Sequence, residues 1–269
     1  MTGLSFRLRG VPEDRLDVSQ LTPKRLAELS AADIGKLVVG TAKSQLTAGD
    51  VFTITGKPGD RIVFEGATGK LDFLGAGLDK GTVIVEGDAG FGAGRAMSGG
   101  RLEIRGDAGS WLASAMTGGF VSVKGSAGGY VGGLRAGDRT GMAGGIVVVE
   151  GDAGDRVGER MRRGTIIVRG RCGVNAGARM LGGTIWAEQG LGTDPGILLR
   201  RGTLIGPAAE KLLPTFVDTG KHDLVILRVL SRYLTATLGR LAPRPLSGTV
   251  RKYAGDLSTI GKGEILITG

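Results

Sequence analysis

The chain has 269 residues, a formal net charge of +9 and 52 glycines, far above the usual share of glycine. With 8 prolines and no Gly-X-Y register it is not collagen, and its recurring blocks of valine, isoleucine and leucine exclude a disordered chain. It has no apolar signal core, no uncharged apolar run long enough to span a membrane, and a single cysteine. We therefore expect a soluble, cytoplasmic protein without a membrane partner, and the positive charge predicts an acidic partner.

Residues 1–48 are predicted to form an N-terminal extension of strand and helix. The alternating segment 4–9 is expected to be a strand, and a short helix is expected from Thr22 and Pro23 to about Leu29. Threonine is favoured at the N-cap and proline at the first helical position. Segments 50–56 and 61–69 are expected to be irregular first units of the repeat that follows.

A short, glycine-rich repeat dominates the middle of the chain. Seven anchor glycines each precede a β-rich block, with successive spacings of 19, 19, 26, 19, 19 and 19: Gly81, Gly100, Gly119, Gly145, Gly164, Gly183 and Gly202. Each unit reads as a short strand and then the pattern G-x-x-G-x-x-x-G. Apolar residues stand two and four positions after the anchor, whereas the fifth position is mostly charged, often with opposite signs in adjacent units.

Such a unit cannot bury its apolar face alone, but stacked units share a continuous core. The sequence therefore predicts an all-β protein, a right-handed parallel β-helix of about seven or more units with GXXGXXXG repeats, over residues 49–206. The right-handed sense follows the general preference of parallel crossovers. The glycine columns are expected at corners, where a positive φ or close packing between units excludes a Cβ atom.

Residues 207–269 are predicted to cap the end of this stack. Segment 223–241 is the long helical candidate, with Asp223 as its N-cap, and we expect it to lie as a lid over the last unit. The residues after it are expected to return as a strand.

Cysteine and methionine are both predicted to be structural. Cys172 aligns with alanines of other units, so we expect it to fill a small buried site rather than act as a nucleophile. A methionine column could suggest soft-metal ligands, but Leu199 continues it, which favours a stack of core side chains. That column contains Met97, Met116, Met142, Met161 and Met180.

No motif in the sequence predicts a catalytic or metal-binding residue. His222 is the only histidine, and we expect it to be an exposed residue at the start of the helix. The repeated G-D-A-G lacks the Gly-Lys-Ser/Thr of a phosphate loop and the nonapeptide spacing of calcium-binding repeats. The insertion in the longer unit, within 133–140, is expected to form a loop on a contact face.

Arginines gather on both sides of the methionine column in the later units. They align by column, Arg160 with Arg179, Arg162 with Arg200 and Arg163 with Arg201. The alignment predicts a basic ridge at this corner, for which two interpretations remain open. The ridge is either a solvated face or interface with an acidic subunit, or a track for a polyanion. The candidate binding residues are Arg160, Arg162, Arg163 and Arg179.

The iterated G-x-x-G-x-x-x-G resembles the β-helical domain shared by the glutamate synthase large subunit and the C subunit of formylmethanofuran dehydrogenase. The sequence GDVFTITG at 49–56, PTF at 214–216 and YAGDLSTIGKGEIL at 253–266 are similar to the pattern of this C subunit. Arginine outnumbers lysine 24 to 11, as is typical of GC-rich bacterial genomes. The resemblance therefore favours the bacterial branch of this family, the C subunit of the formyltransferase/hydrolase complex of methylotrophs.

This resemblance implies a scaffold subunit without catalysis of its own. The complex passes a formyl group from formyl-tetrahydromethanopterin, through a methanofuran-type carrier, to formate in formaldehyde oxidation. The expected partners are an amidohydrolase-like subunit, a formyltransferase subunit and a further subunit. No cofactor is expected on this chain, and zinc is expected only in a partner subunit. Because such carriers bear oligoglutamate tails, the ridge is a candidate site for a tail.

Three other interpretations stay open at this point. The chain resembles the C subunit of the archaeal dehydrogenase, which accompanies molybdenum or tungsten, and it resembles a free-standing relative of the glutamate synthase domain. A β-helical acyltransferase is a third alternative, although those enzymes use 18-residue units and a catalytic histidine, and His222 lies outside the repeats. No nucleic-acid partner is expected, because only 4% of the chain is aromatic and no recognition module is present.

Overall fold

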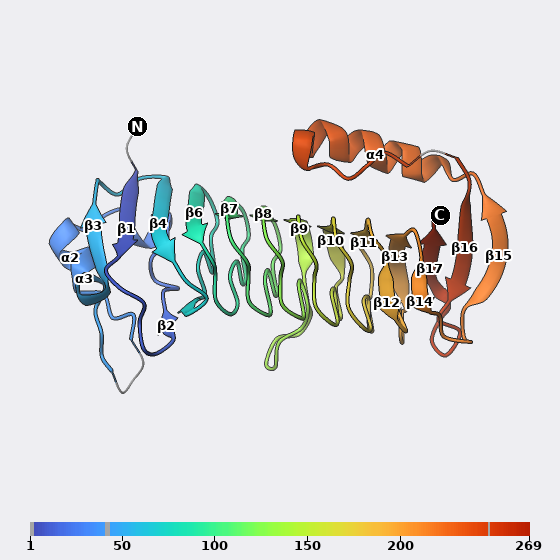
Figure 1. Ribbon diagram of the computed structural model, residues 1–269, viewed down its shortest axis with the longest axis horizontal. Coiled ribbons are helices and arrows are strands. Elements are labelled where there is room, and N and C mark those ends of the chain that lie inside the picture. Colours follow the sequence, from blue (N-terminus) through green and yellow to red (C-terminus); the bar gives the residue numbers. More distant parts are fainter. Residues whose placement is uncertain (1–2, 41–43, 247) are drawn as a thin grey trace.

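The computed structural model describes residues 3–40, 44–246 and 248–269 and is dominated by one 13-stranded sheet (Figure 1). From one edge to the other the sheet contains β3 (Phe52–Thr55), β1 (Leu4–Leu8), β4 (Arg61–Ala67), β6 (Thr82–Gly87), β7 (Arg101–Ile104), β8 (Phe120–Val123), β9 (Ala143–Val149), β10 (Arg163–Val168), β11 (Thr184–Ala187), β13 (Arg201–Gly206), β17 (Lys262–Ile267), β16 (Val250–Gly255) and β15 (Val217–His222). Within the part of the sheet that runs from β1 through β4 to β13 and β17, every pair of adjacent strands is parallel. The predicted all-β class is confirmed.

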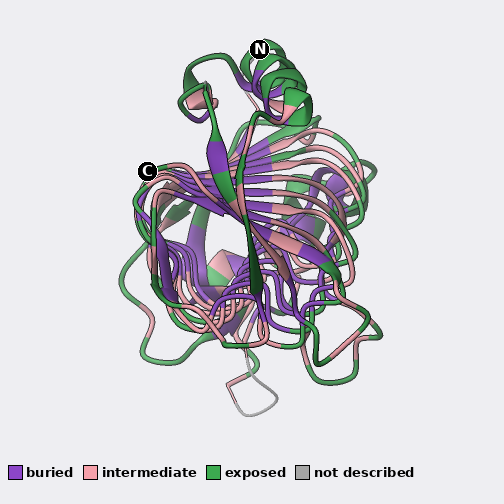
Figure 2. Cartoon of the chain, turned by 90° about the vertical axis from the view of Figure 1, so that its right-hand side faces the viewer, coloured by how far each residue is buried: buried purple, intermediate pink, exposed green. Residues whose placement is uncertain are grey.

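Successive units of the repeat stack in register, so equivalent residues pair directly. Val83, for example, pairs with Leu102, and Leu102 pairs with Val121. A second row of parallel bridges joins the units away from these strands, from Ala89 through successive units to Cys172 and Leu191. Viewed along the stack, buried segments line its interior (Figure 2). The inward positions two and four residues after each anchor glycine thus form the predicted continuous core.

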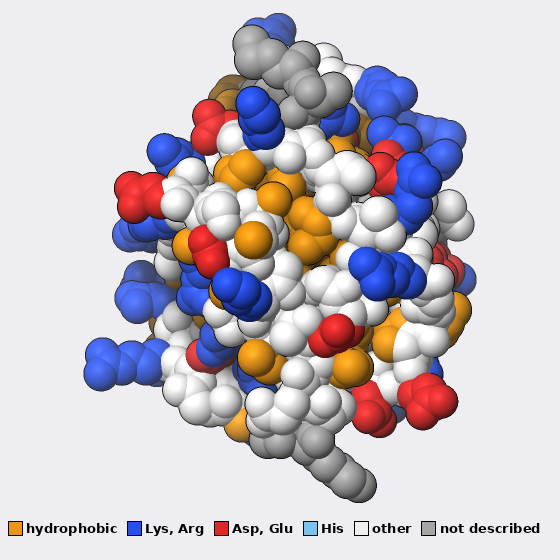
Figure 3. All heavy atoms as spheres, turned by 90° about the vertical axis from the view of Figure 1, so that its left-hand side faces the viewer, with side chains coloured by type: hydrophobic (Ala, Val, Ile, Leu, Met, Phe, Trp, Pro, Cys, Tyr) orange, Lys and Arg blue, Asp and Glu red, His pale blue; other side chains and the backbone are white. Residues whose placement is uncertain are grey.

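The N-terminal end of the stack is closed by antiparallel pairing and an aromatic cluster. Strand β3 pairs antiparallel with β1, so segment 50–56 forms the end of a short helix and an edge strand, and not a first unit of the repeat as expected. The rings of Phe6, Phe52 and Phe64 pack together with centroids 5.2 to 6.0 Å apart. Apolar side chains lie near the middle of this end, with charged side chains around them (Figure 3).

The short helices of the N-terminal region only partly match the expectation. Helix α1 (Pro23–Leu26) begins with Thr22 as N-cap and Pro23 at its first position, but it ends earlier than predicted. Helices α2 (Ala31–Gly35) and α3 (Ala48–Val51) follow, and a capping box of Thr47 and Asp50 starts α3. The two-stranded pairs β2 (Leu16–Asp17) with β5 (Leu71–Asp72) and β12 (Leu191–Thr193) with β14 (Ala209–Lys211) complete the strands.

Anchor glycines and methionines pack against each other from unit to unit. All seven anchors have a positive φ, between +68° and +111°. A Cβ atom on Gly164 would lie 2.8 Å from the Cε of Met142, and one on Gly183 would lie 2.8 Å from the Cε of Met161. The methionines of the column are fully buried. The same contact recurs at Gly145 and Gly202, so it links the two columns in the later units. The prediction that the methionines belong to the core is confirmed.

The aspartates of the G-D-A-G segments fasten one unit to the next. The carboxylate of Asp88 accepts a hydrogen bond from the backbone N–H of Asp107 at 2.9 Å, and Asp107 accepts from Ser126 at 2.7 Å. Asp152 does the same for Arg171 at 2.8 Å. A Cβ atom on a glycine of the next unit would collide with the carboxylate, as at Gly106, 2.2 Å from Oδ1 of Asp88, and at Gly125, 2.0 Å from Oδ1 of Asp107. This motif is thus a structural corner.

Helix α4 (Val225–Leu238) lies on the outer face of the sheet, which corrects the prediction of a lid over the last unit (Figure 1). Its Leu227 and Leu234 join one buried cluster with Ile167, Trp186 and Ile205 of β10, β11 and β13. A 3₁₀ turn, Gly239–Leu241, follows the helix. The end of the stack is covered instead by the returning hairpin of β16 and β17, with β15 at the edge.

The predicted N-cap of this helix is also wrong. Leu224 occupies the N-cap position without a side-chain hydrogen bond, and Asp223 instead forms an ion pair with Arg228. Sheet packing therefore positions the helix, since Leu227, Leu234 and Leu238 are all buried on one side of it.

Candidate functional site

The predicted arginine ridge lies on a corner that is repeated from unit to unit. The backbone N–H of Arg160 bonds to the carbonyl of Ala178, and that of Arg179 bonds to the carbonyl of Ile197. These bonds place Arg160 and Arg179 at equivalent corners of adjacent units. Arg162 follows the same corner, and Arg163 begins β10, where it pairs with Ala143. All four candidate arginines are exposed.

Three of the four candidate arginines have no ion-pair partner among the residues that the structure describes. Within the described ranges of the chain, no carboxylate forms an ion pair with Arg160, Arg162 or Arg163. Arg179 differs, because its guanidinium lies 3.8 Å from the carboxylate of Glu159. Glu159 is buried and is also bonded to Arg156, at 3.2 Å. The charge of the ridge is therefore least compensated at Arg160, Arg162 and Arg163.

The structure adds one cation that the sequence analysis missed. Lys262 in β17 pairs directly with Arg201 in β13, so it extends the column of Arg163 and Arg201. Lys262 is exposed, as is Arg201. The repeat gives no sign of this neighbour, because β17 reaches β13 only after the chain has passed through α4 and a hairpin.

Backbone conformation at the ridge is unusual for arginine. Arg160 has a φ of +54° and Arg179 a φ of +53°, and the equivalent Ala96 and Ala115 of earlier units also have a φ of +54°. This left-handed region costs a residue with a Cβ atom roughly 1–2 kcal/mol. The corner geometry is thus imposed by the repeat, and the arginine side chains do not create it.

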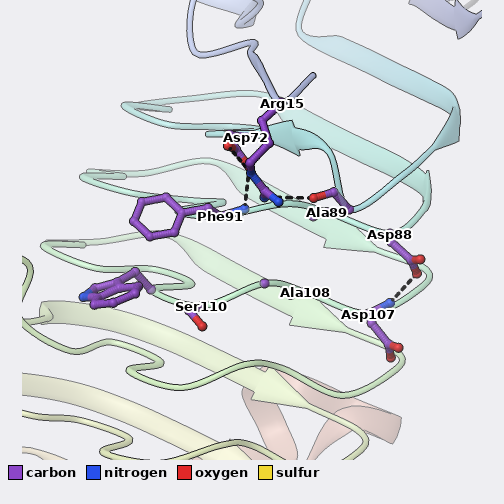
Figure 4. Close-up of a pocket in the computed structure, with 11 residues that line it drawn as sticks. Arg15, Asp72, Asp88, Ala89, Phe91, Asp107, Ala108 and Ser110 are labelled. Atoms are coloured by element: carbon purple, nitrogen blue, oxygen red, sulfur yellow. Dashed lines mark hydrogen bonds and ion pairs between the residues drawn. The ribbon is translucent and has the colours of Figure 1, made fainter. Parts of the chain in front are cut away.

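A hollow of about 630 Å³ lies beside the first units, away from the ridge (Figure 4). Arg15 bonds to Asp72 at 2.5 Å, and Asp72 also accepts the backbone N–H of Phe91 at 2.7 Å. Asp88 and Asp107 of this hollow serve the corner hydrogen bonds between units. The polar groups of the hollow therefore hold the fold together.

Cys172 is buried, as predicted, in the column that Ala153 and Leu191 continue. Burial, and to a lesser degree the charge of Asp152, raises the pKa of its thiol to about 12. Because a thiolate is the nucleophilic form, a thiol with this pKa is unreactive at neutral pH. The structural role predicted for Cys172 is confirmed.

Metal-ligating side chains do not cluster in the described residues. There, no group of three or more histidine, cysteine, aspartate or glutamate side chains could hold a metal ion. His222 ends β15 and contacts the side chain and carbonyl of Thr219, so it lies in a strand and not at the helix start as expected. In the part of the chain that the structure covers, no helix is long and apolar enough to cross a membrane.

Fold and surface together define the class of the protein, a repeat protein whose parallel strands stack into one long sheet and carry a cationic row at one corner. No family model matches the chain. Over 263 residues, 98% of both chains, it is 51% identical to the C subunit of the formyltransferase/hydrolase complex of Methylorubrum extorquens. The chain therefore belongs to the family of C subunits of the formyltransferase/hydrolase complex, which confirms the resemblance seen in the sequence.

A solved structure agrees with this assignment. A chain in the crystal structure of the formyltransferase/hydrolase complex from Methylorubrum extorquens, determined with methylofuran, superposes with a TM-score of 0.93. The match is 42% identical and covers 98% of this chain and 99% of that chain. The fold is thus shared along nearly the whole length, both ends included.

Proposed function

We propose that this chain is a non-catalytic scaffold subunit of a hetero-oligomeric formyltransferase/hydrolase complex. One observation carries the proposal, the 51% identity to the C subunit of such a complex over 98% of both chains. In this complex, formyl transfer to the amine of a methanofuran-type carrier forms a formamide. Water then cleaves that C–N bond to give formate and the free amine. This chain holds the amidohydrolase-like and formyltransferase subunits in register.

The scaffold we propose is a right-handed parallel β-helix over residues 49–206, with an extension at 1–48 and a C-terminal part at 207–269. Direct pairing of equivalent residues in successive units supports this description. The continuous buried core and the hydrogen bonds between corners resist bending, since few side chains can rearrange without opening a void. A stiff rod of this kind suits a subunit that fixes the distance between two active sites.

The ridge of Arg160, Arg162, Arg163 and Arg179 is proposed to contact the oligoglutamate tail of the carrier or an acidic segment of a partner subunit. Three of these side chains have no ion-pair partner among the described residues, and Lys262 adds a further cation beside Arg201. Carboxylates pair well with guanidinium groups, so an oligoglutamate tail fits the donors that the corner presents.

Assembly is tested by co-expressing the tagged chain with the other three subunits and measuring the mass of the purified complex. We expect a complex that contains this chain and produces formate, and we expect formate production to fall when this chain is omitted. The scaffold role would be contradicted if the chain stays monomeric when co-expressed with the three other subunits. It would also be contradicted if those subunits produce formate equally well without this chain.

The ridge is tested by changing Arg160, Arg162, Arg163 and Arg179 to serine in the assembled complex. We expect carrier affinity to fall about tenfold, the effect of about 1.4 kcal/mol, with a weaker dependence on salt. The matched control replaces four exposed cations near the other end, Arg9, Lys57, Arg61 and Lys80, and removes the same charge. Equal affinities of the ridge variant and the wild type would exclude a tail site. Failed assembly of the ridge variant alone would indicate an acidic partner segment.

A further inference from the structure

One face of helix α4 is apolar and exposed. Its opposite side packs on the sheet, but Val225, Ile226, Val229 and Tyr233 are exposed to 62%, 62%, 54% and 55%. Ile226, Val229 and Tyr233 are three to four positions apart and Val225 is four before Val229, so all four lie along one side of the helix. Neighbouring exposed apolar side chains of this size are rare on a monomer surface unless the surface binds something.

A groove continues this apolar face down to the sheet. It has a volume of about 280 Å³ and lies between α4 and strands β11, β13 and β17. Ile226, Val229 and Tyr233 form its wall on the helix side. On the floor, Glu264 is already bonded to Thr203 at 2.8 Å and to Lys252 at 2.8 Å. The carboxylate on the floor is therefore already paired, and the apolar wall is left without a partner among the described residues.

The charge around this face selects the kind of partner. Helix α4 contains two arginines, Arg228 and Arg232, and no acidic residue. Both arginines are exposed and, on a helix, lie to the side of Val229 away from the groove. Arg228 is paired with Asp223, whereas Arg232 forms no ion pair within the described residues. A second copy of this chain on the same face would bring these cations together, so charge disfavours a dimer and favours an acidic partner.

We propose that the exposed face of α4 and its groove bind a segment of another subunit that presents an apolar row flanked by carboxylates. The apolar row would cover Ile226, Val229 and Tyr233, and the carboxylates would meet Arg228 and Arg232. This interaction rests on the proposed assembly into a hetero-oligomeric complex. The proposed interaction accounts for the exposed apolar side chains of α4, which the packing of the helix on the sheet does not require.

The experiment uses the full chain, co-expressed with the other three subunits. Val229→Asp with Tyr233→Asp places carboxylates where the partner's apolar row would lie, and recovery of each subunit with the tagged chain is measured. We expect at least one partner to be lost about tenfold or more, with an unchanged melting temperature of the isolated chain. The control is Leu257→Asp, since Leu257 is equally exposed, at 59%, but lies outside the groove.

A second variant keeps the test valid if the double substitution unfolds the helix. Val229→Cys introduces an accessible thiol, because the only native cysteine is buried. A photo-crosslinker on this thiol should label one partner subunit, whereas the same crosslinker at Leu257→Cys should not. Arg232→Glu should weaken the same partner severalfold and reverse the effect of salt on its binding.

The outcomes separate this inference from the proposed function. A wild-type chain that fails to bind any of the three subunits contradicts the proposed complex itself. Intact assembly of the Val229→Asp, Tyr233→Asp variant, with no crosslink from position 229, overturns only the role of α4. Crosslinks between two copies of this chain would also overturn it, in favour of a homodimer.

Discussion

The earlier and later units of the stack share one backbone but present different side chains at the same positions. On the outer face, the third residue after the anchor is Glu103 and Ser122 in β7 and β8, but Ile167, Trp186 and Ile205 in β10, β11 and β13. The first set is partly exposed and the second lies under α4. The repeat therefore sets the fold, and the variable positions decide what each half contacts.

A second pair of corners shows the same division. At the corner before the methionine column, earlier units carry stacked aromatic rings, with Trp111 and Tyr130 parallel at a centroid distance of 4.5 Å. The equivalent positions of later units are Arg156 and Asn175, and all four residues have a positive φ. The same backbone conformation thus supports aromatic packing in one half and polar side chains in the other.

The insertion at 133–140 belongs to the aromatic half. Its Arg135 lies over the ring of Phe91 at 5.0 Å, and the carbonyl of Leu134 accepts a hydrogen bond from the indole of Trp111 at 3.1 Å. Asp138 pairs with Arg95 at 2.6 Å. The loop therefore folds back on earlier units and supports the aromatic corner, while its expected role as a contact face remains a prediction.

The largest effect should come from the outer face of the later units. Trp186 is 3% exposed beneath α4, so Trp186→Ala should lower the free energy of unfolding by about 3 kcal/mol or more. Because the cavity lies under α4, hydrogen exchange of Val225–Leu238 should rise most. Ser122→Ala, at the same position of an earlier unit, should change stability by less than about 0.5 kcal/mol. Equal losses in both variants would refute the division between the two halves.

A somewhat smaller loss is expected at an anchor glycine, which both halves share. Gly164→Ala places a Cβ atom on a residue with a φ of +100° and in contact with Met142. The free energy of unfolding, measured by chemical denaturation, should therefore fall by about 2–3 kcal/mol. Gly119→Ala, in the earlier units at a φ of +91°, should lose a similar amount.

Two further variants show whether the contact with methionine matters. Adding Met142→Ala should recover part of the Gly164→Ala loss, because the methyl group that collides is then absent. Gly59→Ala meets open space without a positive φ and should be neutral. Strict additivity of the Gly164 and Met142 losses would show that the two residues do not constrain each other.

Much of the fold could be predicted from the sequence because its constraints are local and repeated. Each anchor glycine has a positive φ, and at the four anchors from Gly145 to Gly202 a methionine lies where a Cβ atom would be, so both columns follow the repeat. Cys172 follows the same logic, since its column holds buried apolar side chains, alanine before it and leucine after it. The arginine ridge was predictable for the same reason, as a set of aligned exposed positions.

The ends of the molecule could not be predicted in this way, since non-repeated segments determine them. Lys262 pairs with Arg201 although the two are far apart in the chain, and nothing near either residue specifies that pairing. The position of α4 left a signal that was missed, the change from Ser122 to Ile167 and Trp186 in one outward column. An apolar residue on an outward face requires a cover, and the amphipathic helix is the segment able to supply it.

The smallest change in stability should occur at the ridge itself. Arg160→Gly removes a charge and relieves the backbone strain of a φ of +54° in the folded state. The greater conformational freedom of glycine stabilises the unfolded state and roughly offsets that gain in stability. We therefore expect the unfolding free energy to change by less than about 0.5 kcal/mol, as for Ala115→Gly at the equivalent corner of an earlier unit. Denaturant unfolding of both variants measures this. If Arg160→Gly is clearly destabilising and Ala115→Gly is not, the arginine supports the fold. If both changes are small and equal, the fold does not need an arginine at this corner, and binding of a ligand or partner is the reason for it.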